Sequence, residues 1–383
     1  MKKLLEIQDL ILRFYTYEGI VKALEGVNLD LAPDETLGVV GETGCGKTVT
    51  ALSLLVLPPP PGKIEQGKIL FHQSDGQTID LLSQSEEELQ GIRGKEIAMI
   101  FQEPGAALNP VYTIGDQISE VLFLHRRNEL YHRALAELER QKEEFKGIFS
   151  PFLSLKNKLE RGIFHRLVHE PQSALTRLLG KLPLIVERRL KKEAKKISIE
   201  LLRDMEIPDP ERIVDRYPHE LSGGMKQRVV IAIAVACHPK LLIADEPTTS
   251  LDVTIQAQIL NLIRRLKEEL GSSILYITHN LGIVAETCDR VAVMYAGSIC
   301  EVAGVRELFH NPCHPYTKAL LETIPKPQSS LKFIPGMVPQ LIDPPPGCRF
   351  HPRCPHAREI CAQKPPSLKE ISPGHWVACY LYL

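Results

Sequence analysis

The sequence of 383 residues predicts an α/β fold, and three features of the chain support that class. A glycine-rich loop at 41–48 follows a short apolar run typical of a buried strand and precedes a predicted helix. Several later apolar runs of strand length end in polar residues, as happens where ligands bind open α/β sheets. Residues 3–31 alternate between apolar and polar in two runs, which indicates an antiparallel β edge. Together these features predict a P-loop NTPase.

The antiparallel edge is predicted from the runs 4–10 and 27–31. Three aromatic residues lie between them, Phe14, Tyr15 and Tyr17. Either these rings close the edge of the sheet by packing, or one of them stacks on a nucleotide base. The sequence alone leaves both interpretations open.

The glycine-rich loop lies between the predicted strand 36–40 and the predicted helix 49–55. With the residue that follows it, the loop reads Gly41-Glu42-Thr43-Gly44-Cys45-Gly46-Lys47-Thr48-Val49. Its glycines let the backbone curl so that successive N–H groups point at phosphate oxygens, and the helix N-terminus adds its dipole. Lys47 supplies a charge for the β- and γ-phosphates, and the Thr48 hydroxyl is a ligand for Mg²⁺. A glycine-rich turn without a ligand is the plainer interpretation, but it does not require Lys47 and Thr48 at this spacing.

Beyond this loop, a turn at 58–62 ends the helix and the run 67–71 returns as a strand. A further strand at 96–101 ends at Gln102. A polar side chain at the carboxyl end of a parallel strand lies where ligands bind, although one glutamine is weak support by itself.

The segment from about 111 to 218 has a helical pattern with spaced leucines and many charges. Within it, residues 126–196 carry 18 Lys and Arg against 9 Asp and Glu. This basic insertion is either a solvated helical segment or a face for lipid headgroups or acidic partner loops.

A second helix start with accessible backbone N–H groups is predicted at 221–228, before the apolar helix 229–237. Ser222 is a good N-cap, and Gly223 and Gly224 expose the backbone. One chain with two phosphate-binding helix starts, of which one carries a lysine, suggests that the second serves the nucleotide of another copy.

A buried apolar strand ends in Asp245 and Glu246. A carboxylate at such a tip holds Mg²⁺ beside the phosphate loop, directly or through water, and Asp245 fits that role. Glu246 is then placed to accept a proton from the attacking water. The alternative, that both carboxylates cap the helix beginning near Val253, is disfavoured because Pro247 and a turn at 249–252 intervene.

The strand 273–278 ends at His279. A single histidine is more often structural, but at this place in the order of motifs it is interpreted as a γ-phosphate contact. A hairpin of 290–295 and 298–302 is predicted to close the sheet.

Composition and charge narrow the classes of protein. A formal net charge of −1 gives no overall attraction for nucleic acid or anionic lipid. The first acidic residue, Glu6, comes too early for a signal peptide, and the longest apolar run, 229–237, is too short to span a membrane. We therefore expect a soluble protein that reaches a membrane only through partners.

Four of the nine cysteines lie in the proline-rich last 36 residues, at Cys348, Cys354, Cys361 and Cys379. Because this tail lacks apolar periodicity, we expect a covalent or metal staple. Disulfides are disfavoured in the cytosol, and structural zinc prefers cysteines about two to four residues apart. Four thiolates from loose loops suit a four-iron, four-sulfur (4Fe-4S) cluster. Free thiols are an alternative, and a mixed zinc site stays open because of three nearby histidines, His351, His356 and His375.

The order of these motifs resembles that of the ATP-binding subunits of ABC transporters. The resemblance covers nearly all of residues 1–302 and rests on the phosphate loop, Gln102, Leu221-Ser222-Gly223-Gly224, Asp245-Glu246, Leu251-Asp252 and His279. Two further segments and the cysteine-rich tail are similar to the dipeptide/oligopeptide importer branch. These segments are Tyr217-Pro218-His219-Glu220 and Asn311-Pro312-Cys313-His314-Pro315-Tyr316-Thr317.

The resemblance implies a RecA-like α/β core with an antiparallel β subdomain and a helical subdomain at about 104–222, all within a nucleotide-binding domain at 1–310. The basic insertion 126–196 belongs to the helical subdomain, and a C-terminal extension with an iron–sulfur motif follows at 311–383. The chain departs from the family pattern in two ways. Met225 stands where most ABC proteins carry glutamine, and the helical region is longer than usual by about half.

The resemblance also implies an ATPase that uses ATP and Mg²⁺ to power import of di- or oligopeptides through a membrane permease. Two subunits, related but different, are expected to sandwich two ATP molecules, with Ser222, Gly223 and Gly224 of one facing the phosphate loop of the other. Gln102 is then a metal contact and the sensor that couples the γ-phosphate to the permease. The same resemblance implies that Phe14 or Tyr15 stacks on the nucleotide base and that Asp252 lies at the nucleotide.

The expected location is the cytoplasmic face of the cell membrane, with an extracytoplasmic peptide-binding protein as an indirect partner and no nucleic acid. A non-transport ABC ATPase acting on ribosomes or nucleic acid usually has two cassettes or a long coiled-coil insert. This chain has one cassette, and its insert is interrupted by Pro151, Pro171 and Pro183. A plain P-loop kinase or GTPase would not need the glycine signature, the segment Leu221-Ser222-Gly223-Gly224. An importer subunit for another solute, such as nickel, shares these motifs, so the sequence does not identify the cargo.

Overall fold

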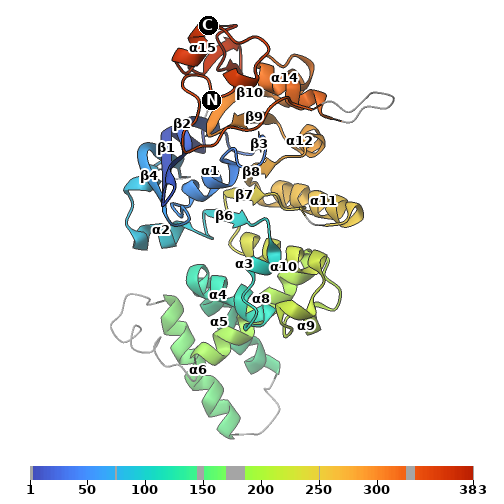
Figure 1. Ribbon diagram of the computed structural model, residues 1–383. Helices are drawn as coiled ribbons and strands as arrows, with labels where there is room; N and C mark the ends of the chain where they lie inside the picture. The colour runs from blue at the N-terminus through green and yellow to red at the C-terminus, as the bar shows by residue number, and fades with distance from the viewer. Residues whose placement is uncertain are drawn as a thin grey trace. The chain divides into compact units, whose positions relative to one another are not determined.

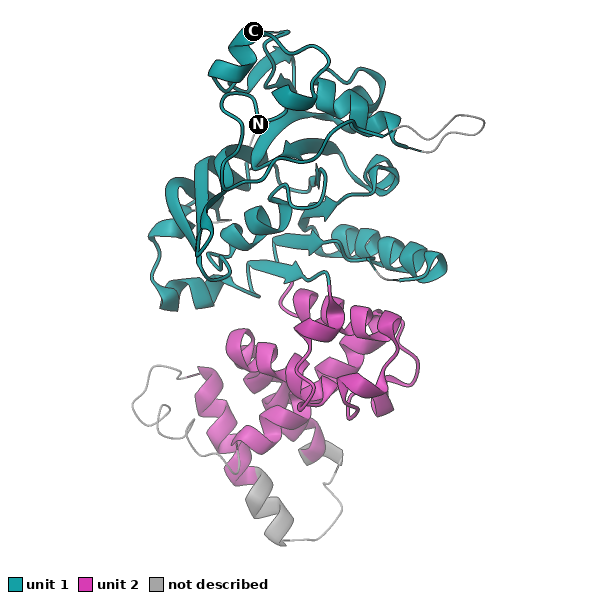
Figure 2. Cartoon of the chain, viewed as in Figure 1, with its two compact units in different colours: residues 1–102, 239–383 teal, residues 103–238 magenta. Residues whose placement is uncertain are grey.

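The computed structural model describes residues 3–73, 76–144, 151–169, 186–249, 251–324 and 333–382. The chain divides into two compact units, residues 1–102 with 239–383, and residues 103–238 (Figure 2). Both β-sheets belong to the first unit, and the described part of the second unit is helical.

The larger sheet confirms the α/β class. Its described strands lie in the order β11-β12-β10-β9-β3-β8-β7-β6 (Figure 1), and those from β9 to β6 are parallel. Strands β3, β7 and β8 are buried along their whole length, which explains why they appear in the sequence as mainly apolar runs without alternation. The strand bounds are β3 Thr36–Val40, β6 Ile97–Ile100, β7 Leu241–Asp245, β8 Ser273–Thr278, β9 Arg290–Tyr295, β10 Ser298–Gly304, β11 Lys369–Ser372 and β12 His375–Val377.

The second sheet is antiparallel, in the order β2-β1-β4-β5, and confirms the predicted antiparallel edge. The strand bounds are β1 Leu5–Thr16, β2 Gly19–Leu31, β4 Gly62–His72 and β5 Thr78–Asp80. Alternate residues of β1, such as Leu5 and Ile7, are buried in one core with residues of β3 and α1, so this sheet packs beside the phosphate loop.

The helices of the first unit flank the larger sheet. They are α1 Lys47–Leu54, η1 Leu81–Ser83, α2 Glu86–Ile92, α11 Val253–Leu270, α12 Leu281–Thr287, α13 Val305–His310, α14 Pro315–Glu322, η4 His351–Arg353 and α15 Glu359–Gln363. Helix α1 begins at Lys47, two residues earlier than predicted, because Gly46 takes the left-handed N-cap conformation with φ 105°. Helix α11 begins at Val253, as the sequence indicates.

The described helices of the second unit include α10, which begins directly after Ser222. They are α3 Pro104–Ala107, α4 Ile114–His125, α5 Arg127–Glu144, α6 Pro151–His169, α8 Arg188–Asp204, α9 Pro210–Ile213, η3 Pro218–Glu220 and α10 Gly223–Val235. Helix α10 begins before the apolar run 229–237, since Ser222 caps it, and it packs on α3, α4 and α8. The compact unit therefore extends to residue 238, beyond the expected subdomain end at about 222.

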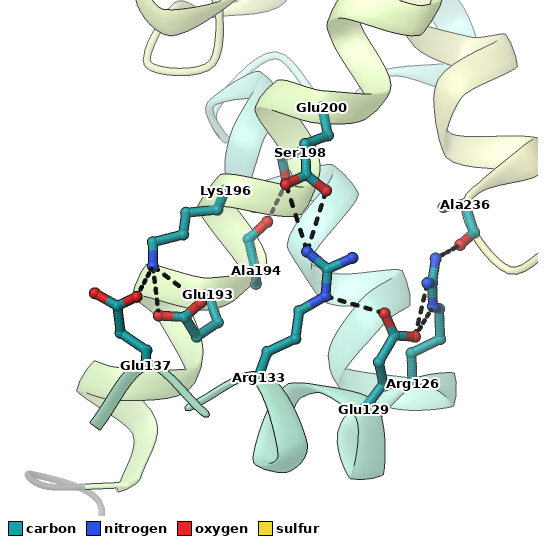
Figure 3. A network of polar contacts seen from close by, with 10 residues as sticks. All are labelled: Arg126, Glu129, Arg133, Glu137, Glu193, Ala194, Lys196, Ser198, Glu200 and Ala236. Carbon is teal, nitrogen blue, oxygen red and sulfur yellow. Dashed lines mark hydrogen bonds and ion pairs between the residues drawn. The ribbon is translucent and has the colours of Figure 1, made fainter. Parts of the chain in front are cut away.

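Several basic residues of the insertion 126–196 are paired with acidic residues of the same unit. Arg133 lies between Glu129 and Glu200, with nitrogen–oxygen distances of 3.2 and 3.1 Å (Figure 3). Lys196 lies between Glu193 and Glu137 at 3.0 and 3.5 Å (Figure 3). These pairs favour a solvated, self-paired helical segment over a free basic face. The structure does not describe residues 145–150 and 170–185, which include Pro171 and Pro183.

The prediction that the hairpin of β9 and β10 closes the sheet is wrong. Strand β12 of the C-terminal tail pairs with β10, Glu301 opposite Val377 and Val302 opposite Trp376, and β11 then pairs with β12. These strands of three and four residues are too short to produce an alternating pattern. They cover backbone groups that β10 would otherwise present as an open edge. The described residues of 311–383 thus pack with the first unit, whereas the division of the chain at 310 remains a prediction.

Stability of the C-terminal extension 311–383 is expected to depend on pH through His314, the N-cap of α14. The Tyr316 N–H donates to His314 Nδ1 at 3.0 Å, and burial lowers the pKa of this imidazole to about 3. A histidine pKa depressed below its unfolded value of about 6.5 gives stability that is complete above that value and is lost as the pH falls toward 3. At pH 5 the loss should be about 2 kcal/mol.

The measurement is urea unfolding at pH 7 and pH 5, followed by fluorescence of Trp376, the one tryptophan of the chain, in β12. His314→Asn is the control, since an asparagine oxygen accepts the same capping bond but does not titrate. We expect this variant to lose less stability between the two pH values. An identical loss in both proteins would remove His314 as the cause.

Candidate functional site

The phosphate loop is shaped by close backbone contacts. A Cβ atom on Gly41 would lie 2.1 Å from the Met294 carbonyl oxygen, so only glycine fits there. Gly46 has φ 105°, and a Cβ atom there would lie 2.9 Å from Leu24. The loop between them joins β3 to α1, as the sequence predicts, and brings the helix N-terminus to the carboxyl edge of the sheet.

Lys47 is held inside this loop. Its ammonium group donates to the carbonyl oxygens of Gly41 and Glu42 at 2.8 and 3.1 Å, and the residue is 6% exposed. The charge of the loop is therefore concentrated at its centre, where a polyphosphate binds in P-loop proteins.

Thr48 and Asp245 meet across the sheet edge. The Thr48 hydroxyl donates to Asp245 Oδ1 at 3.3 Å. Burial raises the pKa of Asp245 to about 6, and the Glu246 carboxylate adds to the shift, whereas Thr48 and Lys47 oppose it. A hydroxyl and a carboxylate this close to a phosphate loop are oxygen donors of the kind that Mg²⁺ prefers. Gln102, the third expected metal contact, donates its Nε2 N–H to Glu246, and its contact with a metal stays a prediction.

Glu246 is the centre of the polar cluster at the carboxyl ends of β6, β7 and β8. Its Oε2 accepts from Thr249 Oγ1 at 2.9 Å and from Gln102 Nε2 at 3.2 Å, and its Oε1 accepts from His279 Nδ1 at 3.0 Å. Burial alone would raise the pKa of Glu246, but the hydrogen bonds from His279 and Thr249 outweigh it and hold that pKa below its usual value. The carboxylate is therefore ionised and oriented.

Thr249 is the residue of this cluster that sequence reasoning missed, because 249–252 was interpreted as a connecting turn. The sequence does contain a pattern that could have identified Thr249. A hydroxyl residue three positions after a carboxylate, within a turn, often bonds back to it. Asp252, from the same turn, caps α11 by accepting from the Ile255 N–H at 2.9 Å. Ser250 lies outside the described residues.

The aromatic residues of β1 differ in their environments. Phe14 is partly buried against the core, whereas Tyr15 is 44% exposed and donates its hydroxyl to Glu65. The Lys63 ammonium lies 5.6 Å from the centre of the Tyr15 ring. Tyr17 is fully exposed. Phe14 thus packs partly against the core, the Tyr15 and Tyr17 rings are accessible, and base stacking by one of these rings stays a prediction.

The glycine signature lies in the second unit. The Ser222 hydroxyl accepts from the Met225 N–H at 3.3 Å, which makes Ser222 the N-cap of α10. Gly223 and Gly224 form the first turn of that helix, and Ser222 and Gly223 are exposed. The helix start is thus available to a ligand or a partner.

The four tail cysteines line one small pocket of the first unit, together with His351 and His356. Burial and the neighbouring thiols raise the pKa of Cys348 to about 11. Burial also raises the pKa values of Cys354 and Cys379. The third expected histidine, His375, is elsewhere: its Nε2 donates to the buried Glu301 carboxylate at 2.7 Å.

The phosphate loop, the two carboxylates at the end of β7, the antiparallel sheet and the helical unit define an ATP-binding cassette. The chain belongs to the ABC transporter family, whose pattern matches residues 24–249. Residues 300–361 match the C-terminal region of oligopeptide/dipeptide transporters.

Relatives and solved structures agree with this assignment. The chain is 44% identical over 382 residues to a probable peptide ABC transporter ATP-binding protein of Sinorhizobium fredii, covering 98% of this chain and 94% of that protein. It is 42% identical to the oligopeptide transport ATP-binding protein OppD of Bacillus subtilis, covering 99% of this chain and 89% of that protein. An ATP-binding cassette dimer solved after hydrolysis with ADP and phosphate is 21% identical, with a TM-score of 0.54 over 79% of this chain and 99% of that one, and supports the fold alone. None of the described helices has the length and apolar character that crossing a bilayer requires.

Proposed function

We propose that this protein hydrolyses ATP to power the import of dipeptides or oligopeptides through a membrane permease. The match at 300–361 to the oligopeptide/dipeptide region and the similarity to peptide transport proteins along nearly the whole chain support the cargo class. The observation that carries the ATPase role is the oriented Glu246 carboxylate at the sheet edge beside the phosphate loop.

In this proposal Glu246 accepts the proton of the attacking water while His279 and Thr249 fix its direction. Gln102, which is hydrogen-bonded to the same carboxylate, senses whether the γ-phosphate is present and couples its presence to the permease. His279, 59% exposed, also reaches the γ-phosphate.

Nucleotide binding is assigned to the loop 41–48 with Val49, where backbone N–H groups and Lys47 hold the phosphates. Thr48 and Asp245 hold Mg²⁺, with Gln102 as a further contact, and the ion would neutralise charge on the β- and γ-phosphates. The base stacks on Tyr15 or Phe14.

A second cassette completes the site. The exposed helix start at Ser222, Gly223 and Gly224 is proposed to face the γ-phosphate bound by the partner cassette, with Asp252 near that junction. We propose a related but different chain as the partner, at the cytoplasmic face of the membrane, with an extracytoplasmic peptide-binding protein supplying cargo and no role for nucleic acid.

Affinity purification of the chain from its native membrane tests the cargo class. We expect a permease pair and a second cassette to copurify. The extracytoplasmic binding protein that serves this permease should bind peptides from a mixture of peptides and other solutes. A receptor that binds only nickel complexes would shift the function to the alternative importer class. Copurification with ribosomes in place of membrane proteins would contradict import.

We further propose that the four tail cysteines hold a 4Fe-4S cluster. Four sulfurs around one zinc ion lie about 3.8 Å apart. Among the described residues, no three of the four tail sulfurs lie within 4.8 Å of one another, whereas Glu301, Cys313 and His375 do. Each cysteine of a four-iron cluster binds its own iron, which suits this spacing. The cluster would supply the positive charge that lets the raised-pKa thiols ionise, and its role is structural.

Protein purified without oxygen should be brown, absorb broadly at roughly 400 nm and contain about four irons per chain. Cys379→Ser should lose iron and change the fluorescence of Trp376 in the adjacent strand, whereas Cys237→Ser, in the second unit, should do neither. Colourless protein with one zinc per chain would establish the zinc alternative instead.

A further inference from the structure

The C-terminal extension contacts the phosphate loop through Glu42, the second residue of that loop. The Glu42 carboxylate accepts from Arg353 Nη1 at 2.8 Å and from Arg353 Nη2 at 3.2 Å, a two-point ion pair across 311 positions of sequence. The Glu42 N–H donates to the Tyr316 hydroxyl at 3.0 Å. The Arg353 side chain is 5% exposed and that of Glu42 is 26% exposed, so solvent screens this pair little on the arginine side.

The Arg353 side chain is held in place because each of its N–H groups donates a hydrogen bond. The two remaining N–H groups of its terminal nitrogens donate to the Tyr295 hydroxyl and the Ile334 carbonyl at 3.2 Å each, and its Nε donates to Pro335 at 2.8 Å. A guanidinium has five N–H donors, and each of them has an acceptor here. The position of Arg353 therefore fixes that of the Glu42 carboxylate.

Tyr316 is equally constrained. It is fully buried, and its ring lies 4.6 Å from that of Tyr295 and 5.3 Å from that of Phe350. Its hydroxyl holds the Glu42 N–H from the side of the extension. Lys47 binds the Glu42 carbonyl, so the backbone of this residue is held on both sides.

We propose that Arg353 and Tyr316 are positioning residues for ATP binding, which set the conformation of the phosphate loop through Glu42. Glu42 places a negative charge within the loop that receives a polyphosphate. Arg353 neutralises this carboxylate and turns it toward the extension. Without Arg353, an uncompensated carboxylate beside the phosphates opposes binding, and the loop loses an anchor. The proposal rests on the nucleotide-binding role proposed for this loop.

The test is ATP affinity of the full chain, measured by titration, together with kcat and KM for hydrolysis in the assembled complex. Arg353→Gln should weaken ATP binding and raise KM by about tenfold, with a smaller change in kcat, because a hydrogen-bonded charge is lost. Tyr316→Phe should weaken binding by about threefold, the effect of one neutral hydrogen bond. Arg353→Lys should not rescue the loss, since an ammonium lacks the two-point geometry.

A second substitution separates charge from folding. The Glu42→Gln/Arg353→Gln double variant should bind ATP more tightly than Arg353→Gln alone, because it removes the unpaired carboxylate. Equal or weaker binding by the double variant would contradict the neutralising role.

Arg349 provides a matched control. It also adjoins a tail cysteine, is 8% exposed in its side chain, and pairs with Glu25 of β2 at 2.8 Å, but Glu25 lies outside the phosphate loop. Arg349→Gln should loosen the tail with little change in ATP affinity. If Arg349→Gln and Arg353→Gln weaken binding equally, general docking of the tail is responsible and the proposal fails. Wild-type protein that binds no ATP would instead refute the nucleotide-binding role itself.

Discussion

Replacement of Glu246 by glutamine is expected to leave ATP affinity near that of the wild type and to slow hydrolysis by about a hundredfold or more. The glutamine carbonyl oxygen can still accept from His279, and the Thr249 hydroxyl can accept from the new amide N–H, but an amide cannot take the proton of the attacking water. ATP-bound pairs of cassettes should then accumulate, because the step that separates them is blocked. Phosphate release, nucleotide titration and size-exclusion chromatography with ATP measure these three effects on one preparation.

Lys47→Ala is the contrasting variant for this experiment. Removal of the ammonium group that lies inside the loop should weaken nucleotide binding itself. Turnover at the wild-type rate in Glu246→Gln would show that another group is the base. Loss of affinity in Glu246→Gln equal to that in Lys47→Ala would make Glu246 a binding residue.

Ser222→Arg is expected to abolish hydrolysis while the single subunit keeps its affinity for ATP. The long cation would occupy the helix start where the γ-phosphate of the partner cassette is proposed to lie. ATP titration of the isolated chain and phosphate release by the assembled complex measure the two quantities.

Thr113→Arg controls for the loss of a helix cap in the same unit. Thr113 caps α4 by accepting from the Asp116 N–H at 3.1 Å, as Ser222 caps α10, and loss of either cap costs about 1 kcal/mol. Hydrolysis should persist in this variant. A fall in the affinity of isolated Ser222→Arg for ATP, matching that of Lys47→Ala, would argue against a site shared between subunits.

The residues of the polar cluster around Glu246 could be predicted from sequence because strand ends have a recognisable pattern. Gln102, Glu246 and His279 each lie one or two residues after an apolar run, and parallel strands place such positions on one edge. The sequence did not reveal that Gln102 and His279 both bond to the Glu246 carboxylate. These contacts depend on the order of β6, β7 and β8 in the sheet.

The role of the tail could not be predicted in the same way. Its proline-rich sequence suggested a separate, stapled segment, but β12 adds to the edge of β10 and Arg353 reaches Glu42. Both interactions join residues more than 70 positions apart, through strands of three residues or a single side chain, and neither produces a periodic signal. Position in the fold, not local pattern, gives these residues their contacts.

Peptide uptake by the complete complex tests the central proposal most directly. The chain, its partner cassette and the permease are placed in liposomes with ATP enclosed, and the receptor and labelled di- and oligopeptides are added outside. Liposomes with wild-type protein should accumulate peptide while ATP is consumed, and those with Glu246→Gln should do neither. ATP-driven uptake of a nickel complex with no peptide uptake, or hydrolysis that liganded receptor does not change, would contradict the proposal.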